Sequence, residues 1–528
     1  MNLSMIRVLL VIILFGGVFL TSDMFMEYWI QPKTYLILIL SLVLLFTCVV
    51  SRNGFRNLFE SLRSRSFFYC IALVSLITSL HGFLQYIGLI SSFNEVYTIT
   101  GTFENPAGFA TVQAAMFPFV FSRCFDKTSG RFHKCFSFVV SVLCLFSVVL
   151  SESRMGFLAI CAAILVFFAF TDSVVLFFKK HRWVWIPTAF IIVSLFIVLY
   201  YIKKDSADGR LFIWMRCIDM IKERPLFGYG TYGFQSNYMA AQADFFRGNP
   251  DSPFVMLADT VTKPFNEYIE LTVNYGLVGL TMAVALLVLI LLRLFKSDKD
   301  TKVLGLSFVV SVFVMCQFSY PFMYDVLWVL CFMAIVPAFI KNGKEFEMPR
   351  FVRVVVSLLL IGGIVSSFRA MYYDMKWTEM YKRTELGYVN RMMPYYAEMK
   401  HIMKNNPLFI YNYAAELNKA QRFEESLEVL DICSKSWNDY HVQILYSDIY
   451  AKKGDMDRAL MACDQAYYMV PCRFDPLYRE MIIYTMLSDT ANAVRVAYEI
   501  IEKPIKVRSD KLNEMVSMAE RVVSSYDN

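Results

Sequence analysis

The residues best suited to chemistry in this sequence are a few arginines and carboxylates that border apolar segments. Arg154 stands at a short turn between two apolar runs, and Arg210 and Arg216 lie near the start of a long loop. Glu267 and Glu270 begin the apolar run that follows this loop. Arginine can hold a phosphate through two parallel N–H donors, and a carboxylate can accept a proton. Interfacial arginines also simply snorkel to headgroups, so residue type alone leaves both roles open for Arg154.

Other kinds of chemistry find little support. The sequence has five His, and none lies in the long loop, so we expect neither a metal cluster nor a Ser-His-Asp triad there. Gly228, Gly230 and Gly233 match a dinucleotide-binding pattern by their glycines alone, but no strand precedes them, and we reject a nucleotide site. The cations form short clusters between apolar runs, which argues against nucleic acid binding.

The elements that must position these residues are membrane helices. Hydrophobic residues make up 57% of the 528 residues and charged residues 18%, whereas soluble domains have about 45–50% and about 25%. The sequence predicts an all-α fold, a polytopic membrane helix bundle of about eleven spans of roughly 20 residues each. The predicted spans lie near residues 5–22, 34–50, 67–90, 105–124, 135–151, 155–171, 184–202, 267–294, 303–319, 321–341 and 351–373.

The cations between the spans predict the side that each loop faces. Lys and Arg gather in every second short loop, whereas the short loops between them hold Lys33 and Arg154. Positively charged loops stay in the cytoplasm. We therefore expect a cytoplasmic N-terminus, and an odd number of spans puts the C-terminal part outside.

The sequence divides into two predicted domains. Residues 1–373 form the membrane domain, which includes a large outer loop at 203–266. Apolar residues recur at helical spacing in this loop, and a turn follows at 225–230, so we expect ordered structure there. The apolar residues with this spacing are Leu211, Trp214, Met215, Ile218 and Ile221.

Residues 374–528 form the second domain and contain an internal repeat. Tyr450, Gly454, Ala459, Ala466 and Pro471 fall at the spacings of a tetratricopeptide repeat. Three further residues lie about one repeat length away: Gln421, Ser426 and Ala493. We predict a C-terminal α-solenoid outside the membrane. Such an array binds a protein partner in its groove or packs as an assembly module, and the sequence favours neither.

Four stretches of the membrane part carry short motifs. They are 101–108 (GTFENPAG), 153–156 (SRMG), 210–214 with 225–230 (RLFIW and PLFGYG), and 265–269 with 274–279 (FNEYI and NYGLVG). In their order and spacing, these motifs resemble the O-antigen ligase and polymerase family, which includes protein O-oligosaccharyltransferases. The resemblance covers roughly residues 1–373.

The resemblance implies an enzyme of the bacterial cytoplasmic (inner) membrane that works at the periplasmic face. It would move a glycan from an undecaprenyl diphosphate carrier to an acceptor hydroxyl, without metal, nucleotide or other cofactor. Arg154 and Arg210 match the family's diphosphate-binding arginines. Asn105 and Asn266 belong to the motifs and are expected to bind substrate, as is Glu270, and we add Arg216 as a guess from its place in the same segment as Arg210.

One position departs from the family pattern. Where the family commonly carries His before Asn, this chain has Phe265, so the usual general base is missing. We predict that Glu267 takes that role or shares it with Glu270, which lies three residues later on the same helix. Two other interpretations stay open: Glu267 merely occupies the first turn of its helix, favoured by the dipole, or Phe265 marks a chain that has lost catalysis.

The acceptor is the least defined partner. An acceptor in lipid A core or in a protein would make the chain an O-antigen ligase or an oligosaccharyltransferase, and a growing lipid-linked glycan would make it a polysaccharide polymerase. A non-catalytic membrane scaffold is a further alternative. A transporter is disfavoured because the two halves lack matching helices broken by Gly or Pro.

Overall fold

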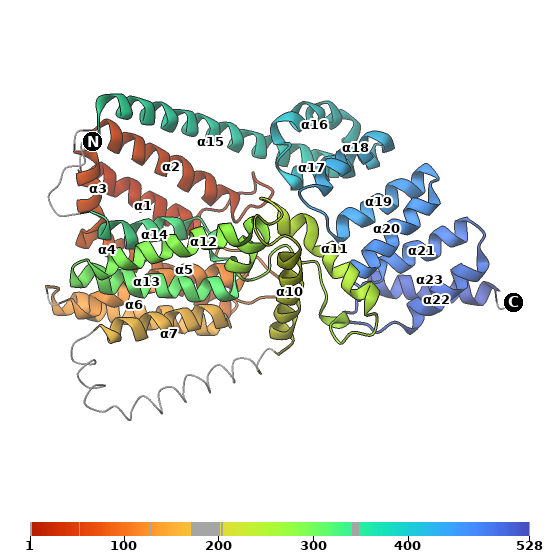
Figure 1. Ribbon diagram of the computed structural model, residues 1–528, viewed down its shortest axis with the longest axis horizontal. Helices are drawn as coiled ribbons and strands as arrows, with labels where there is room; N and C mark the ends of the chain where they lie inside the picture. Colours follow the sequence, from red (N-terminus) through yellow and green to blue (C-terminus); the bar gives the residue numbers. More distant parts are fainter. Residues whose placement is uncertain are drawn as a thin grey trace. The chain divides into compact units, whose positions relative to one another are not determined.

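The computed structural model describes residues 3–51, 53–126, 128–170, 201, 204–340 and 348–526. In these residues all regular secondary structure is helical (Figure 1). The chain forms two compact units, each treated separately below. The first takes in the described residues of Met1–Leu199, Phe265–Glu267 and Ala283–Thr378, and the second those of Tyr200–Pro264, Tyr268–Met282 and Glu379–Asn528.

The first unit is a bundle of helices, many of which run side by side (Figure 1). Its complete helices are α1 (Leu3–Phe19), α2 (Gln31–Val50), α3 (Gly54–Leu62), α4 (Arg65–Tyr86), α5 (Pro106–Ser122), α6 (Arg131–Leu150), α7 (Arg154–Ala169), α13 (Lys299–Phe318) and α14 (Val326–Ile335). It also contains part of α12 (Glu267–Phe295), most of α15 (Arg350–Glu385) and the 3-10 turns η1 (Arg123–Phe125), η4 (Pro321–Met323) and η5 (Val336–Ala338).

Helix α5 forms the core of this bundle, since every residue from Gly108 to Val120 is buried. It packs against α4, α6, α7, α13 and α14. The Gln113 side chain receives a hydrogen bond from the Ser75 hydroxyl at 2.9 Å and donates to the Ser79 hydroxyl at 2.6 Å. Such polar contacts between apolar helices hold membrane bundles together, because lipid offers the same groups no partner.

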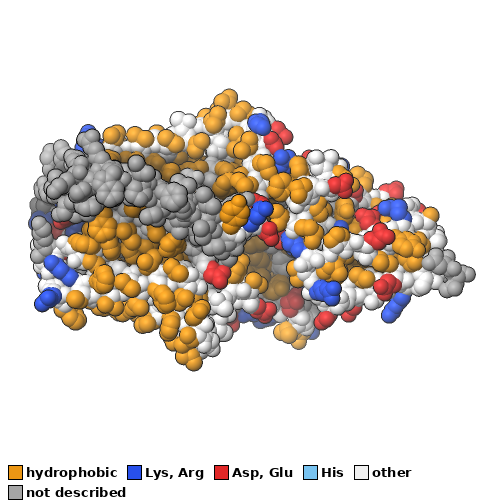
Figure 2. Space-filling model, turned by 90° about the horizontal axis from the view of Figure 1, so that it is seen from below, with side chains coloured by type: hydrophobic (Ala, Val, Ile, Leu, Met, Phe, Trp, Pro, Cys, Tyr) orange, Lys and Arg blue, Asp and Glu red, His pale blue; other side chains and the backbone are white. Residues whose placement is uncertain are grey.

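In the part of the chain that the structure describes, six helices are long and apolar enough to cross a membrane: α2, α4, α6, α12, α13 and α15. Shorter apolar helices lie at Leu3–Phe19, Arg154–Ala169 and Val326–Ala338. Hydrophobic side chains spread over the surface of the first unit, whereas acidic and basic side chains are interspersed over the second (Figure 2). A bundle that exposes so much apolar surface needs lipid around it, and the chain is a multi-pass membrane protein.

Most predicted spans overlap a helix, but two need comment. The span at 184–202 lies almost entirely outside the described residues. The span at 321–341 is not one continuous helix, since it divides into η4, α14 and η5. Pro337, which cannot donate a backbone hydrogen bond, lies where α14 gives way to η5. The count of eleven spans therefore stays a prediction.

The second unit is also helical. It contains α10 (Lys204–Glu223), α11 (Gly233–Gly248), η3 (Val255–Leu257), α16 (Val389–Met403), α17 (Pro407–Lys419), α18 (Phe423–Ser434), α19 (Tyr440–Lys453), α20 (Met456–Met469), α21 (Asp475–Met486), α22 (Thr490–Glu502) and α23 (Asp510–Tyr526). The helices α17 to α22 form consecutive packed pairs (Figure 1). This succession of helix pairs agrees with a solenoid, although the tetratricopeptide type stays a prediction.

The packing of the pairs explains the small residues of the repeat pattern. Ala459 and Ala466 are fully buried in α20, and Ser426 is fully buried in α18. Helix α20 also packs against α11, so part of the outer loop belongs to the same compact unit as the C-terminal helices. Helix α15 continues past the predicted span to Glu385 and ends before Gly387, whose φ of 89° is a left-handed conformation that favours glycine.

Candidate functional site

In the first unit, Asn105 organises the loop that leads into α5. Its side-chain oxygen accepts the backbone N–H of Gly108 at 3.0 Å and so caps the helix, as asparagine commonly does. Its amide nitrogen donates to Glu104 at 2.9 Å and to the Tyr320 hydroxyl at 3.1 Å. Gly108 has no room for a side chain, because a Cβ would lie 2.7 Å from the Tyr324 ring. Asn105 therefore has an architectural task whatever else it binds.

Glu104 is a largely buried carboxylate beside this cap. The Tyr324 hydroxyl donates to its Oε1 at 2.7 Å, while its buried Oε2 has no hydrogen-bond partner among the described residues. Burial raises the pKa of Glu104, and the Tyr324 hydrogen bond and the positive charge of Lys33 partly offset this rise. Lys33 itself is buried, donates to the Thr102 carbonyl at 2.5 Å and lies 4.0 Å from the centre of the Phe103 ring.

Phe265 and the two residues that follow lie against the same turn, 317–324. The Phe265 ring contacts the Tyr320 ring, with centroids 5.7 Å apart. Asn266 donates to the Gln317 carbonyl at 3.2 Å, and the Glu267 carboxylate accepts the backbone N–H of Phe322 at 3.2 Å. The structure thus brings Asn105, Asn266 and Glu267 to one turn, although Asn105 and Glu267 are far apart in the sequence.

Sequence reasoning did not select Glu104, Tyr320 or Tyr324 as polar partners of this turn. Glu104 occupies the variable position of its motif, and the tyrosines stand in an apolar run that suggests only packing. Lys33 carried a usable signal, because it is one of the two cations on the short loops predicted to face outside.

Arg154 is the first residue of α7, where it is half-buried. The Ser153 hydroxyl caps this helix by accepting the Gly156 N–H at 3.4 Å. Gly156 allows α7 to approach α5 closely, since a Cβ there would lie 2.7 Å from the Cβ of Ala110. The Ser-Arg-Met-Gly motif therefore fixes the start of a tightly packed helix and puts the guanidinium at its end.

In the second unit, α10 carries Arg210 and Arg216. Arg210 is half-buried. Arg216 forms an ion pair with Asp219 at 3.1 Å, and its guanidinium lies 4.3 Å from the Phe245 ring centre. These contacts order the Arg216 side chain, and its role as a substrate-binding residue stays a prediction.

Glu270 also has close partners in the second unit. Its carboxylate receives Lys263 Nζ at 2.7 Å and the Gln235 amide at 3.3 Å, and its side chain is 11% exposed. Lys263 and Gln235 thus occupy the Glu270 carboxylate, and the choice of a base between Glu267 and Glu270 stays a prediction.

The glycine motifs meet at a break in α12. Gly276 has φ 64° and ψ −166°, which interrupts the helix and frees two backbone carbonyls before it and two N–H groups after it. The turn 225–230 satisfies all four groups, and we name this arrangement the clasp. Its hydrogen bonds are Leu277 N to Pro225 O at 2.8 Å, Val278 N to Leu226 O at 3.2 Å, Tyr229 N to Val273 O at 3.0 Å and Gly230 N to Asn274 O at 2.8 Å.

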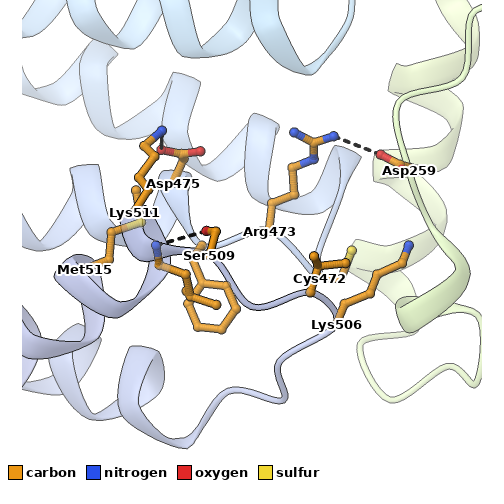
Figure 3. A pocket seen from close by; sticks show the side chains of 11 residues that line it. Asp259, Cys472, Arg473, Asp475, Lys506, Ser509, Lys511 and Met515 are labelled. Atoms are coloured by element: carbon orange, nitrogen blue, oxygen red, sulfur yellow. Dashed lines mark hydrogen bonds and ion pairs between the residues drawn. The ribbon is translucent and has the colours of Figure 1, made fainter. Parts of the chain in front are cut away.

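Two cavities of the second unit lie away from the predicted site residues. One, of about 290 Å³, is lined by charged and apolar side chains that include Asp259, Arg473, Lys506, Lys511 and Met515 (Figure 3). The other, of about 470 Å³, is lined among others by Tyr467 and Tyr468. None of the residues that line them was predicted to act in catalysis or binding.

The charges around the first cavity are largely paired. Arg473 donates to Asp259 at 3.0 Å and Lys511 to Asp475 at 2.8 Å (Figure 3). Burial alone would raise the pKa of Asp259, but the Arg473 hydrogen bond and charge bring it below its usual value. The described residues contain no group of three or more His, Cys, Asp or Glu side chains that could hold a metal ion.

Comparison with known families bears on one segment. Residues 139–284 match the family model described as O-antigen ligase. The matched segment runs from α6 into α12 and contains Arg154, Arg210 and Glu267, whereas Asn105 and the C-terminal helices lie outside it. Among curated proteins, a search finds no match to the chain. The family match agrees with the resemblance read from the motifs over this segment.

Proposed function

We propose that the protein is a membrane enzyme that transfers a glycan from an undecaprenyl diphosphate carrier to an acceptor hydroxyl. The observation that carries this proposal is the O-antigen ligase match over 139–284, the segment that holds both motif arginines. Such transfer needs no nucleotide, because the bond between sugar and diphosphate already stores the energy. The enzyme sits in a bacterial inner membrane with its N-terminus in the cytoplasm and its C-terminal helices in the periplasm.

In the proposed reaction, the acceptor oxygen attacks the anomeric carbon of the first sugar. The bond between this carbon and the diphosphate oxygen breaks, and the electron pair leaves with the diphosphate. Arg154 and Arg210 stabilise the charge that develops on the leaving group, and Arg216, Asn105 and Asn266 help to hold the substrates. The arginines take the place that a divalent cation has in other phosphate chemistry, so the transfer is metal-independent.

The proton of the acceptor hydroxyl passes to a carboxylate, since Phe265 stands where the family commonly has His. Glu267 takes this proton in the proposal. Its support is its place two residues from Phe265 on the same turn and the ion pair that occupies Glu270. Glu104 is a second candidate carboxylate at this turn, and the experiment below separates it from Glu267.

A gene-deletion strain complemented with variants tests the function. We expect Arg154→Ala and Arg210→Ala to leave long glycans on the carrier and none on lipid A core or protein, with mass spectrometry of both pools as the measurement. Arg495→Ala is the matched control, because Arg495 is an exposed arginine paired with Glu480 and Glu499 in the C-terminal helices. Normal transfer by both variants at normal protein level would support the scaffold interpretation instead.

The same assay distinguishes the possible acceptors and identifies which glutamate acts as the general base. Final acceptors capped with a single repeat unit would indicate a polymerase rather than a ligase or oligosaccharyltransferase. Glu267→Gln should abolish transfer, and Glu60→Gln, which affects an exposed residue paired with Arg56, should not. Loss in Glu104→Gln together with normal transfer in Glu267→Gln would move the base to Glu104.

A further inference from the structure

Helix α10 has two apolar faces, and among the described residues only one of them packs against protein. Phe212, Ile213, Cys217 and Met220 are buried. Phe212 stacks on Phe254 at 5.0 Å and belongs to a small core in this unit. This buried face already accounts for the attachment of α10 to the rest of the second unit.

The other face is exposed along the helix. Leu211, Met215 and Ile218 are between 40% and 47% exposed, and their spacing of four and three residues puts them in one stripe. Exposed lysines, Lys204 and Lys222, continue the same stripe at its two ends, with the half-buried Asp208 between Lys204 and Leu211. An apolar stripe with a lysine at each end is typical of a helix that lies in a membrane surface, because the long side chains can reach the headgroups.

The turn after α10 adds a second apolar feature. Leu226 is 60% exposed and Phe227 is 73% exposed. The clasp holds this turn against α12, where the backbone N–H of Val278 donates to the Leu226 carbonyl. From Leu277 to Leu292 the helix carries no charged residue, so Leu226 and Phe227 lie at the level where α12 enters the apolar layer.

We propose that Leu211, Met215, Ile218, Leu226 and Phe227 form an interfacial face that inserts into the outer surface of the lipid bilayer. Lipid is the occupant that the structure favours, because the clasp makes the face continuous with a membrane helix and because lysines border it. Interfacial helices bury their apolar side about 5–10 Å into the boundary between headgroups and acyl chains. Neither the contact of α10 with lipid nor that of the turn at Leu226 and Phe227 depends on substrate.

This inference has a consequence for the proposed function. Arg210 directly precedes Leu211, so a membrane-embedded α10 carries this guanidinium at headgroup depth. The phosphates of a lipid carrier lie at the same depth. If the proposed glycan transfer proves wrong, the lipid contact itself is still open to test.

Site-specific photo-crosslinking in the full-length protein, reconstituted in phosphatidylethanolamine and phosphatidylglycerol nanodiscs, tests the inference. Phe227→p-benzoylphenylalanine and Met215→p-benzoylphenylalanine report on the face. The positive control carries the probe in place of Met282, which is 70% exposed on α12. The negative control carries it in place of Met461, which is 71% exposed on α20. All four side chains are exposed, so each variant should fold, and its thermal unfolding midpoint checks this.

We expect lipid adducts at positions 227 and 215, seen as mass shifts of one phospholipid. The adduct yield at these positions should be at least about tenfold higher than at position 461 and close to the yield at position 282. Adduct yields no higher than at position 461 would overturn the proposal. Crosslinks between two copies of the chain at position 227 would also overturn it, since they would make the face a dimer interface.

Discussion

The clasp predicts that Gly276 tolerates no side chain. Alanine at this position would have to adopt φ 64° and ψ −166°, a region almost reserved for glycine that costs about 1–3 kcal/mol. Its Cβ would also lie 2.2 Å from the Leu226 carbonyl oxygen and 2.5 Å from the Phe227 nitrogen. Backbone atoms on both sides leave no flexible side chain to move, so the turn must separate from α12.

Separation removes the four backbone hydrogen bonds of the clasp, each worth about 0.5–1.5 kcal/mol net. Opening the clasp therefore costs about 2–6 kcal/mol. Gly276→Ala should remove most of this free-energy cost, so that the locally open state becomes populated. A difference of about 3 kcal/mol corresponds to roughly a hundredfold change in an equilibrium constant. Hydrogen–deuterium exchange of the full-length protein measures it directly at the amides of Tyr229, Gly230, Leu277 and Val278.

Three other glycines make the comparison specific. Gly228→Ala should behave like Gly276→Ala, since its Cβ would lie 2.4 Å from the Val273 carbonyl oxygen at φ 64°. Gly230→Ala has φ 96° but no atom within 4 Å of its Cβ, so it reports backbone strain alone. Gly209→Ala lies inside α10 with open space around it and should stabilise the helix by about 0.5–1 kcal/mol. Equal exchange in Gly276→Ala and Gly209→Ala would refute the reasoning.

Three further predictions concern the Asn105 turn and the phosphate chemistry. Asn105→Ala removes the cap of α5 and should cost about 0.5–2 kcal/mol, measured as a lower unfolding midpoint, whereas Asn105→Asp keeps the capping oxygen but loses the donors to Glu104 and Tyr320 and should restore only part of the stability. Burial raises the pKa of Glu104 above its ordinary 4.5. The contribution of this carboxyl group to stability is therefore present below pH 4.5 and is lost as pH rises through the folded-state pKa. The Glu104→Gln variant should have a higher unfolding midpoint than the unmodified protein at pH 7 but not at pH 4. Glycan transfer by the purified protein should persist in excess EDTA, and a loss that added Mg²⁺ restores would contradict the assignment of the diphosphate to arginines.

Helix α10 shows what its own sequence could and could not predict. The apolar spacing predicts a helix in the outer loop, and α10 occupies Lys204–Glu223. The residues that define this spacing include Leu211, Met215 and Ile218, yet these remain exposed. Periodicity identifies an amphipathic helix, but a helix with two apolar faces gives no indication of which one meets protein and which meets lipid.

The turn at 317–324 is a harder case for sequence reasoning. Its partners come from two separate stretches: the loop at 101–105, which Lys33 also contacts, and 265–267. No local pattern links them, since their proximity depends on how helices pack in lipid. The motifs nevertheless include both stretches, and each has an unusual backbone: Gly101 has φ 60° and Phe265 has φ 56°.

The motif residues divide into those that build the site and those that act in it. Gly228, Gly230 and Gly276 make the clasp, Asn105 caps α5, and the buried Asn274 side chain accepts the backbone N–H of Phe234 at 2.9 Å. Each has a structural reason that holds without any substrate.

A chain can therefore keep these motifs and the fold that they specify while its chemistry changes. Phe265 is the position where we expect such a change, because its ring packs on Tyr320 at the turn, whereas the family that the motifs resemble commonly has a proton acceptor there. The activity then depends on whether a neighbouring carboxylate replaces that acceptor, and the comparison of Glu267→Gln with Glu104→Gln decides this question where the motifs cannot.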